Sequence, residues 1–248
     1  MFIMLLVSAL IVGISLGLLG AGGSILTVPA LMLLMGMNEK TAIACSLAIV
    51  GLIAFTGIFS SIKNKSLQPK ILFWFILSSL PAASFGAYLG ALFADGVQTL
   101  ILIAVMLLAA GRMFLNSPIQ PVHNSQLPKL LFAGALTGLI TGIVGVGGGF
   151  LIVPALVLFA GLTMQQAVAN SLLLIALNAT TAFGTLYVSP QMPEIDWAVI
   201  TVMAAVGSVA VVAGQSLAHK LEQRILKRIF ASLLVLVAIS LLVNLFLF

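Results

Sequence analysis

The sequence predicts an all-α fold: a polytopic transmembrane helical bundle built from two inverted repeats. Of its 248 residues, 62% are hydrophobic and only 6% are charged, whereas about 25% of the residues of a soluble domain carry a charge. Apolar stretches of roughly 20 residues, long enough to cross about 30 Å of hydrocarbon, recur along the chain. Two closely similar glycine-rich segments divide these stretches into two halves.

The repeat is visible in the residues themselves. The segment Gly17 to Gly36 reads GLLGAGGSILTVPALMLLMG, and the segment Gly142 to Gly161 reads GIVGVGGGFLIVPALVLFAG. The offset between them is 142 − 17 = 125 residues, and it continues without a gap to Leu47 and Leu172, so that about half of this window is identical. The identities include glycines and a proline, which shared hydrophobicity alone does not explain.

Each half is predicted to contain a broken, re-entrant helical hairpin followed by three transmembrane helices. Repeat 1 covers residues 1–115, with its hairpin at 3–36 and its helices at 41–61, 71–94 and 97–114. Repeat 2 covers residues 129–248, with its hairpin at 129–161 and its helices at 165–188, 197–218 and 226–247. The polar, proline-containing residues 116–128 read as a linker.

Loop charges predict how the chain sits in the membrane. Basic residues favour the cytoplasmic side of the membrane. This rule predicts that the linker and two basic loops are cytoplasmic. One loop contains Lys63, Lys65 and Lys70, and the other contains Lys220, Arg224, Lys227 and Arg228. Asp95, Glu194 and Asp196 then lie outside, as do both termini. Equivalent loops carry opposite charge, as an inverted repeat requires. In the alternative topology the segment 129–161 crosses the membrane once, which would put the Arg224 cluster outside and Glu194 inside.

Composition also limits the class of protein. The formal net charge is +5, but the basic residues are scattered through short loops and form no patch for nucleic acid. The single cysteine, Cys45, excludes an internal disulfide and a multi-cysteine metal site, and no cofactor is expected. The first 20 residues lack Lys and Arg, so they are interpreted as structure and not as a cleaved signal. We therefore expect a multi-pass protein of the cell inner membrane.

The glycine-rich breaks, at Gly20 to Gly23 and Gly145 to Gly149, are the candidate binding site. Unpaired backbone groups are tolerated at membrane depth only where they line a protein cavity. The returning arms, about 18 Å long at 1.5 Å per residue, would place their N-termini near the bilayer midplane, where free N–H groups bind anions. Pro29 and Pro154 leave two starting points open, because each arm either begins at its proline or begins earlier and contains it. The predicted substrate-binding amides are those of Gly22, Gly23, Ser24, Gly147, Gly148 and Gly149.

Polar side chains on the helix after each hairpin are further candidates. They are Ser46, Asn170, Ser171 and Asn178; each is as readily explained by a hydrogen bond within its own helix. Every Asp, Glu, Lys and Arg lies in or beside a predicted loop, so no embedded carboxylate is expected. Cys45, which aligns with Asn170, is expected to be a small buried hydrophobe. The pairs Gly86/Gly90 and Gly207/Gly214 are expected to permit close helix packing.

The doubled motif, GAGGSILTVPAL and GVGGGFLIVPAL, resembles that of the TauE/SafE sulfite exporter family, also called TSUP, and the similarity covers essentially the whole chain. The resemblance implies a membrane transporter of small anions such as sulfite, sulfonates including sulfoacetate, thiosulfate or related organosulfur compounds. Ser24 departs from the third glycine that is usual in the family, so the resemblance does not imply an exactly symmetric site. A passive anion channel would use the same amides. An enzyme is not expected, because the sequence offers no Ser/His/Asp set and no metal-ligand cluster. The sequence leaves the oligomeric state open.

Overall fold

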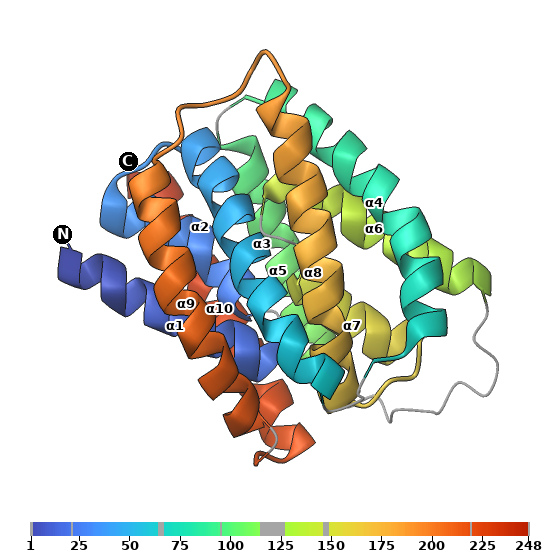
Figure 1. Cartoon of the computed structure of the whole chain (residues 1–248). Helices are drawn as coiled ribbons and strands as arrows, with labels where there is room; N and C mark the ends of the chain where they lie inside the picture. The colour runs from blue at the N-terminus through green and yellow to red at the C-terminus, as the bar shows by residue number, and fades with distance from the viewer. Residues whose placement is uncertain are drawn as a thin grey trace.

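The computed structural model describes residues 2–20, 22–63, 67–94, 96–114, 127–145, 149–218 and 220–247. Within these ranges the chain forms ten helices and no strand. Figure 1 shows how the helices are arranged. The helices of the first half are α1 (Phe2–Leu19), α2 (Gly22–Met35), α3 (Glu39–Lys63), α4 (Pro69–Leu92) and α5 (Val97–Phe114). Those of the second half are α6 (Leu127–Val144), α7 (Gly149–Phe159), α8 (Met164–Tyr187), α9 (Trp197–Ala218) and α10 (Gln223–Leu247).

Five of the described helices are long and apolar enough to cross a membrane, and they comprise α3, α4, α6, α8 and α9. Large apolar side chains cover the outside of the bundle; Phe59 is 75% exposed and Val209 is 76% exposed. Such a surface is compatible with lipid and not with water. The predicted all-α transmembrane bundle is therefore confirmed.

Helices α3 and α8 form the centre of the bundle. The apolar span of α3 is 72% buried and that of α8 is 61% buried, against 33% for α4 and 44% for α9. The two central helices pack on each other, while α9 packs on α3 and α4 packs on α8. Side chains on α3 and α8 consequently reach the interior of the protein on most of their faces.

The helices repeat with the offset seen in the sequence. Adding 125 to the bounds of α1, residues 2–19, gives those of α6, residues 127–144. The contacts repeat as well, because α1 packs on α9 just as α6 packs on α4. In Figure 1 α3 runs down the view while its counterpart α8 runs up it. The opposite directions of α3 and α8 support an inverted arrangement of the two repeats. How the repeats are oriented in the membrane is a prediction from the loop charges.

Glycines allow the peripheral helices to pack closely. A Cβ atom at Gly86 of α4 would lie 3.0 Å from the Leu139 carbonyl carbon of α6 and would overlap its oxygen. A Cβ atom at Gly214 of α9 would overlap the Ile14 carbonyl of α1 in the same way. The expectation that these glycines permit close packing is confirmed.

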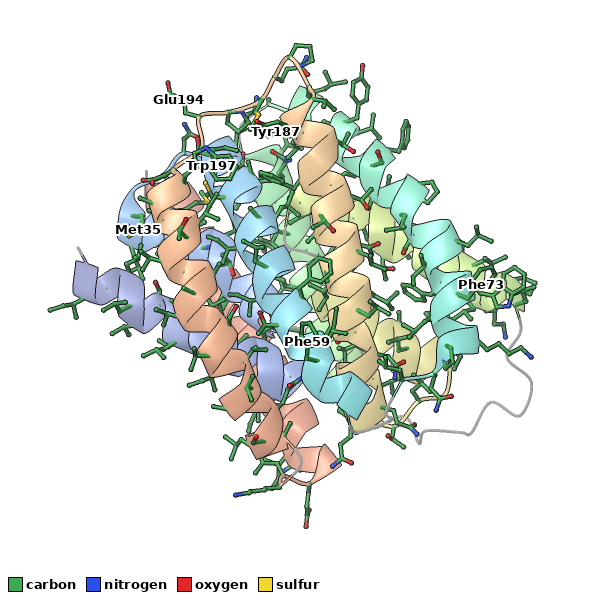
Figure 2. All side chains as sticks on the ribbon, in the orientation of Figure 1. Met35, Phe59, Phe73, Tyr187, Glu194 and Trp197 are labelled. Atoms are coloured by element: carbon green, nitrogen blue, oxygen red, sulfur yellow. The ribbon has the colours of Figure 1, made fainter. Side chains whose placement is uncertain are left out.

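Aromatic side chains mark the end of the bundle where α8 ends and α9 begins. Tyr187 and Trp197 lie at this end together with Glu194 in Figure 2. The ring of Phe183 makes an edge-on contact with Trp197, at 6.4 Å between ring centres. Tyr and Trp favour the boundary between membrane and water, so this end of α8 is a natural interface position.

Candidate functional site

Each hairpin is broken at a glycine in the left-handed conformation. Gly20 has φ 67° and follows α1; Gly145 has φ 70° and follows α6. Gly20 N donates to Leu16 O at 2.8 Å, and Gly145 N donates to Thr141 O at 2.9 Å. Glycine adopts this conformation without the steric cost of a Cβ atom, and it commonly ends helices in this way. The helix breaks predicted from the glycine clusters are confirmed.

The returning arms begin well before their prolines. Helix α2 starts at Gly22 and contains Pro29, and α7 starts at Gly149 and contains Pro154. Of the two starting points left open by the sequence, the earlier one is therefore correct. Gly22, Gly23 and Ser24 form the first turn of α2, where N–H groups lack a partner within the helix. Gly147 and Gly148, and the side chain of Ser24, lie outside what the structure describes.

Gly23 also has a packing role. A Cβ atom there would lie 2.5 Å from Leu16 Cβ and would overlap the Val12 carbonyl of α1. The missing side chain lets α2 fold back along α1. The two returning arms, α2 and α7, contact each other.

Two serines hold the breaks from the opposite repeat. Ser171 Oγ on α8 donates to Gly20 O at 2.9 Å, and Ser46 Oγ on α3 donates to Gly145 O. Each hydroxyl shares its proton with the carbonyl three residues earlier in its own helix, which is the alternative that the sequence left open. Both serine side chains are completely buried. The two contacts are related by the same offset of 125 residues, so the central helix of each half binds the broken hairpin of the other. These serines, selected from the sequence as candidate ligands, position the backbone of the breaks.

The breaks fit tightly against the central helices. A Cβ atom at Gly20 would lie 2.6 Å from Ser171 Oγ and 2.7 Å from Val168 Cα. At Gly145 it would lie 2.9 Å from Ile43 Cβ. Glycine is therefore required at both positions for two reasons, the left-handed backbone conformation and the close contact between the break and the central helix.

The two candidate asparagines have different surroundings. Asn170 Oδ1 accepts from Gln68 N at 2.7 Å, which ties α8 to the residue before α4. Asn178 Oδ1 accepts from Ser79 Oγ of α4 at 2.9 Å. The Nδ2 atom of Asn178 is buried and has no partner among the described residues. Asn178 is thus the candidate side chain that retains an unused donor.

Gln98, in the first turn of α5, is a buried polar residue beside the second break that was not selected from the sequence. Its Nε2 donates to Ile143 O, near the end of α6, and the side chain is 4% exposed. It lines a cavity of about 20 Å³ that also touches Lys40 and Gly142, enough for about one water molecule. The available signal was an uncharged polar residue at the start of an otherwise apolar helix.

Glu39 is also buried, although the sequence grouped it with loop acids. It is the first residue of α3, which begins two residues before the predicted start of this helix, and it is only 8% exposed. Its carboxylate accepts from Gly96 N at 2.7 Å and from Thr99 N at 2.8 Å, and also from Thr99 Oγ1. A carboxylate in this place stabilises the N-terminus of α5 through its free N–H groups.

We expect Glu39→Ala to lower the free energy of unfolding by about 1 to 3 kcal/mol, because buried N–H groups lose their acceptor. Asp196 is a matched control, since its exposed carboxylate accepts from Ala198 N and Val199 N at the start of α9; Asp196→Ala should cost about 1 kcal/mol or less. Thermal unfolding in detergent measures both. Anion flux should persist in Glu39→Gln; a loss of flux in a stable Glu39→Gln protein would show that this carboxylate takes part in transport.

Cys45 is completely buried in α3, as expected for a small hydrophobe. Among the described residues no three His, Cys, Asp or Glu side chains lie close enough together to hold a metal ion. The polar groups gathered at the breaks are backbone amides, hydroxyls and carboxamides. This chemistry suits hydrogen bonding to a solute.

The fold and the site define a polytopic membrane protein in which two broken hairpins meet inside a helical bundle. The family model described as Sulfite exporter TauE/SafE matches residues 5–241. The chain belongs to this family, which is one of membrane transporters.

Several known proteins are similar to this chain along most of their length. A probable membrane transporter protein of Xylella fastidiosa is 30% identical over 241 residues, covering 92% of this chain and 90% of that protein. The probable membrane transporter protein YunE of Bacillus subtilis is 28% identical over 210 residues, covering 73% and 76%. One from Haemophilus influenzae is 29% identical over 258 residues, covering 95% and 96%. No solved structure matches.

Proposed function

We propose that the protein transports small sulfur-containing anions across the cell inner membrane. The substrate class comprises sulfite, sulfonates such as sulfoacetate, thiosulfate and related organosulfur compounds. The anion binds near the bilayer midplane at the N-termini of α2 and α7, one from each repeat. Membership of the sulfite exporter TauE/SafE family supports the sulfur chemistry.

The observation that carries this proposal is the reciprocal attachment of the two helix breaks. Ser171 binds the break before α2, and Ser46 binds the break before α7. Each attachment fixes the start of a returning arm against the centre of the bundle, where the N-terminal N–H groups and the positive end of the helix dipole favour an anion. Two such ends, contributed by arms that contact each other, provide positive potential without a buried cation.

The distribution of acids is compatible with an anionic substrate. The described carboxylates lie at or beyond helix ends: Glu39 begins α3, and Glu194, Asp196 and Glu222 lie between helices. No described carboxylate therefore faces the middle of the bundle, where it would repel an anion. Transport without a compensating proton moves net charge, so flux should respond to membrane potential by about 2.3 kcal/mol per charge per 100 mV.

Reconstitution in liposomes tests the proposed function and separates it from the alternative, a passive anion channel. We expect uptake of labelled sulfite or sulfoacetate to saturate and to be accelerated by the same anion trapped inside the vesicle. A channel would give flux without counterflow. Absence of protein-dependent flux for the entire panel of sulfur anions would overturn the proposal.

Binding can be measured independently of flux. A ligand at 100 times its dissociation constant stabilises a protein by about 2.7 kcal/mol, which raises the melting temperature of the purified protein. Sulfite, thiosulfate, sulfoacetate and chloride should be compared at equal ionic strength. Stabilisation by a sulfur anion and not by chloride is the expected result.

A further inference from the structure

A line of polar side chains follows one face of α8. Ser171, Asn178 and Thr185 are spaced by seven residues, a spacing that keeps side chains on the same side of a helix. Ser171 binds the break at Gly20. Asn178 and Thr185 face α4, where Ser79 Oγ lies 2.9 Å from Asn178 Oδ1 and Ser84 Oγ lies 2.7 Å from Thr185 Oγ1. We call Ser79, Ser84, Asn178 and Thr185 the α4–α8 polar track.

The track connects the centre of the bundle with one end of it. Thr185 is two residues before Tyr187, which closes α8 at the aromatic end (Figure 2). Asn178 lies nine residues before Tyr187, or about 14 Å at 1.5 Å per residue. Between them Gly184 is exposed and a Cβ atom there would meet nothing within 4 Å. The surface of α8 is thus uncovered beside the outer part of the track.

Asn178 supplies the observation that points to a ligand. The side chain is 0% exposed, yet its Nδ2 atom has no hydrogen-bond partner among the described residues. A buried donor left unpaired destabilises a protein, and polar groups in membrane segments often mark functional paths. An N–H donor with no acceptor selects a ligand that offers oxygen atoms, above all an oxyanion.

The opposite side of the bundle lacks this donor. The residue of α3 that corresponds to Asn178 is Ile53, since 178 − 125 = 53, and it is completely buried. Its Cδ1 atom fills the place where a side chain at Gly207 of α9 would lie. The two sides of the bundle are therefore chemically unequal at this position, although each has a hydroxyl pair, which on the α3–α9 side is Thr56 with Ser208.

We infer that the anion passes between the central site and the aromatic end of the bundle along the α4–α8 polar track, with Asn178 Nδ2 as its intermediate binding group. The α3–α9 side has the apolar side chain of Ile53 at the corresponding position and offers no donor there. The inference rests on the proposed function, because it assigns a path to the same substrate.

The substitution Asn178→Asp tests the donor. The aspartate keeps an oxygen for Ser79 Oγ, but it replaces the N–H group by an anionic oxygen. One hydrogen bond to a charged group is worth about 1.5 to 3 kcal/mol, so flux of sulfoacetate into liposomes should fall about tenfold or more. Thr56→Val, which removes a hydroxyl from the other side, should transport as the unaltered protein does.

The outcomes distinguish the two proposals. If the unaltered protein carries no sulfur anion, the proposed function fails. If it does and a folded Asn178→Asp protein transports equally well, the track is wrong. Equal loss of flux in Asn178→Asp and Thr56→Val would also overturn it, because the effect would then not be specific to the α4–α8 side.

A second variant covers the case in which Asn178→Asp fails to fold. Thr185→Cys in a Cys45→Ala background should react with a sulfonate-bearing thiosulfonate reagent, and added sulfoacetate should slow the labelling severalfold. Ser208→Cys, placed in the hydroxyl pair of the α3–α9 side, is the control and should show no protection. Labelling of Thr185→Cys that is indifferent to sulfoacetate would contradict the inference.

Discussion

Gly20→Ala is expected to abolish anion transport and to destabilise the protein. The alanine would need φ near 67°, a conformation that costs an L-residue about 1 to 2 kcal/mol. Its Cβ atom would also lie 2.6 Å from Ser171 Oγ and 2.7 Å from Val168 Cα. The break must then move away from α8, which separates Ser171 from the Gly20 carbonyl and displaces the start of α2.

Gly36 offers a control that has the same strain without the crowding. It follows α2 with φ 66°, and a Cβ atom there would meet nothing within 4 Å. Gly36→Ala should therefore cost about 1 to 2 kcal/mol and leave flux intact. The difference in flux and melting temperature between the two variants measures the contribution of the contact between the break and α8. Similar behaviour of both would show that this contact is unimportant.

Gly142→Val is expected to prevent assembly of the bundle. A Cβ atom at Gly142 of α6 would lie 2.8 Å from the Gly86 carbonyl carbon and would overlap the Ala83 carbonyl oxygen. These are backbone atoms of α4, so the whole helix would have to shift. Overpacking typically costs about 1 to 3 kcal/mol and sometimes more, and we expect about 3 kcal/mol or more here.

Size-exclusion chromatography and thermal unfolding of purified protein measure this effect. Gly111→Val is the control, because Gly111 lies within α5 and a Cβ atom there would meet nothing within 4 Å; it should be neutral or slightly stabilising, since glycine is a poor helix former. Gly17→Val, at the equivalent position of the first repeat, should fail as Gly142→Val does. Its Cβ atom would lie 2.8 Å from Gln215 N of α9.

Local features of the chain were readable from the sequence. The membrane class follows from composition, because hydropathy belongs to each segment regardless of its neighbours. The helix breaks at Gly20 and Gly145 follow from glycine clusters repeated at a constant offset, because left-handed backbone favours glycine wherever it occurs. The repeat further indicated which residues are equivalent, including Ser46 and Ser171.

What those residues contact was decided by the tertiary structure. Ser46 and Gly145 are 99 residues apart, and Ser171 and Gly20 are 151 apart, so no local pattern records either hydrogen bond. Gly23 packs on α1, where the sequence predicted ligand contact alone. Glu39, expected beside a loop, is buried because the N-terminus of α5 lies against it.

The chemical difference between the α4–α8 side and the α3–α9 side also depends partly on the sequence and partly on the tertiary structure. The offset of 125 residues makes Asn178 and Ile53 equivalent positions, but the unused donor of Asn178 became apparent only once Ser79 of α4 was found to occupy its oxygen. Sequence periodicity determines which face of a helix a side chain lies on. Whether a polar group on that face is satisfied depends on the neighbouring helix, and that neighbour is chosen by packing between segments far apart in the chain.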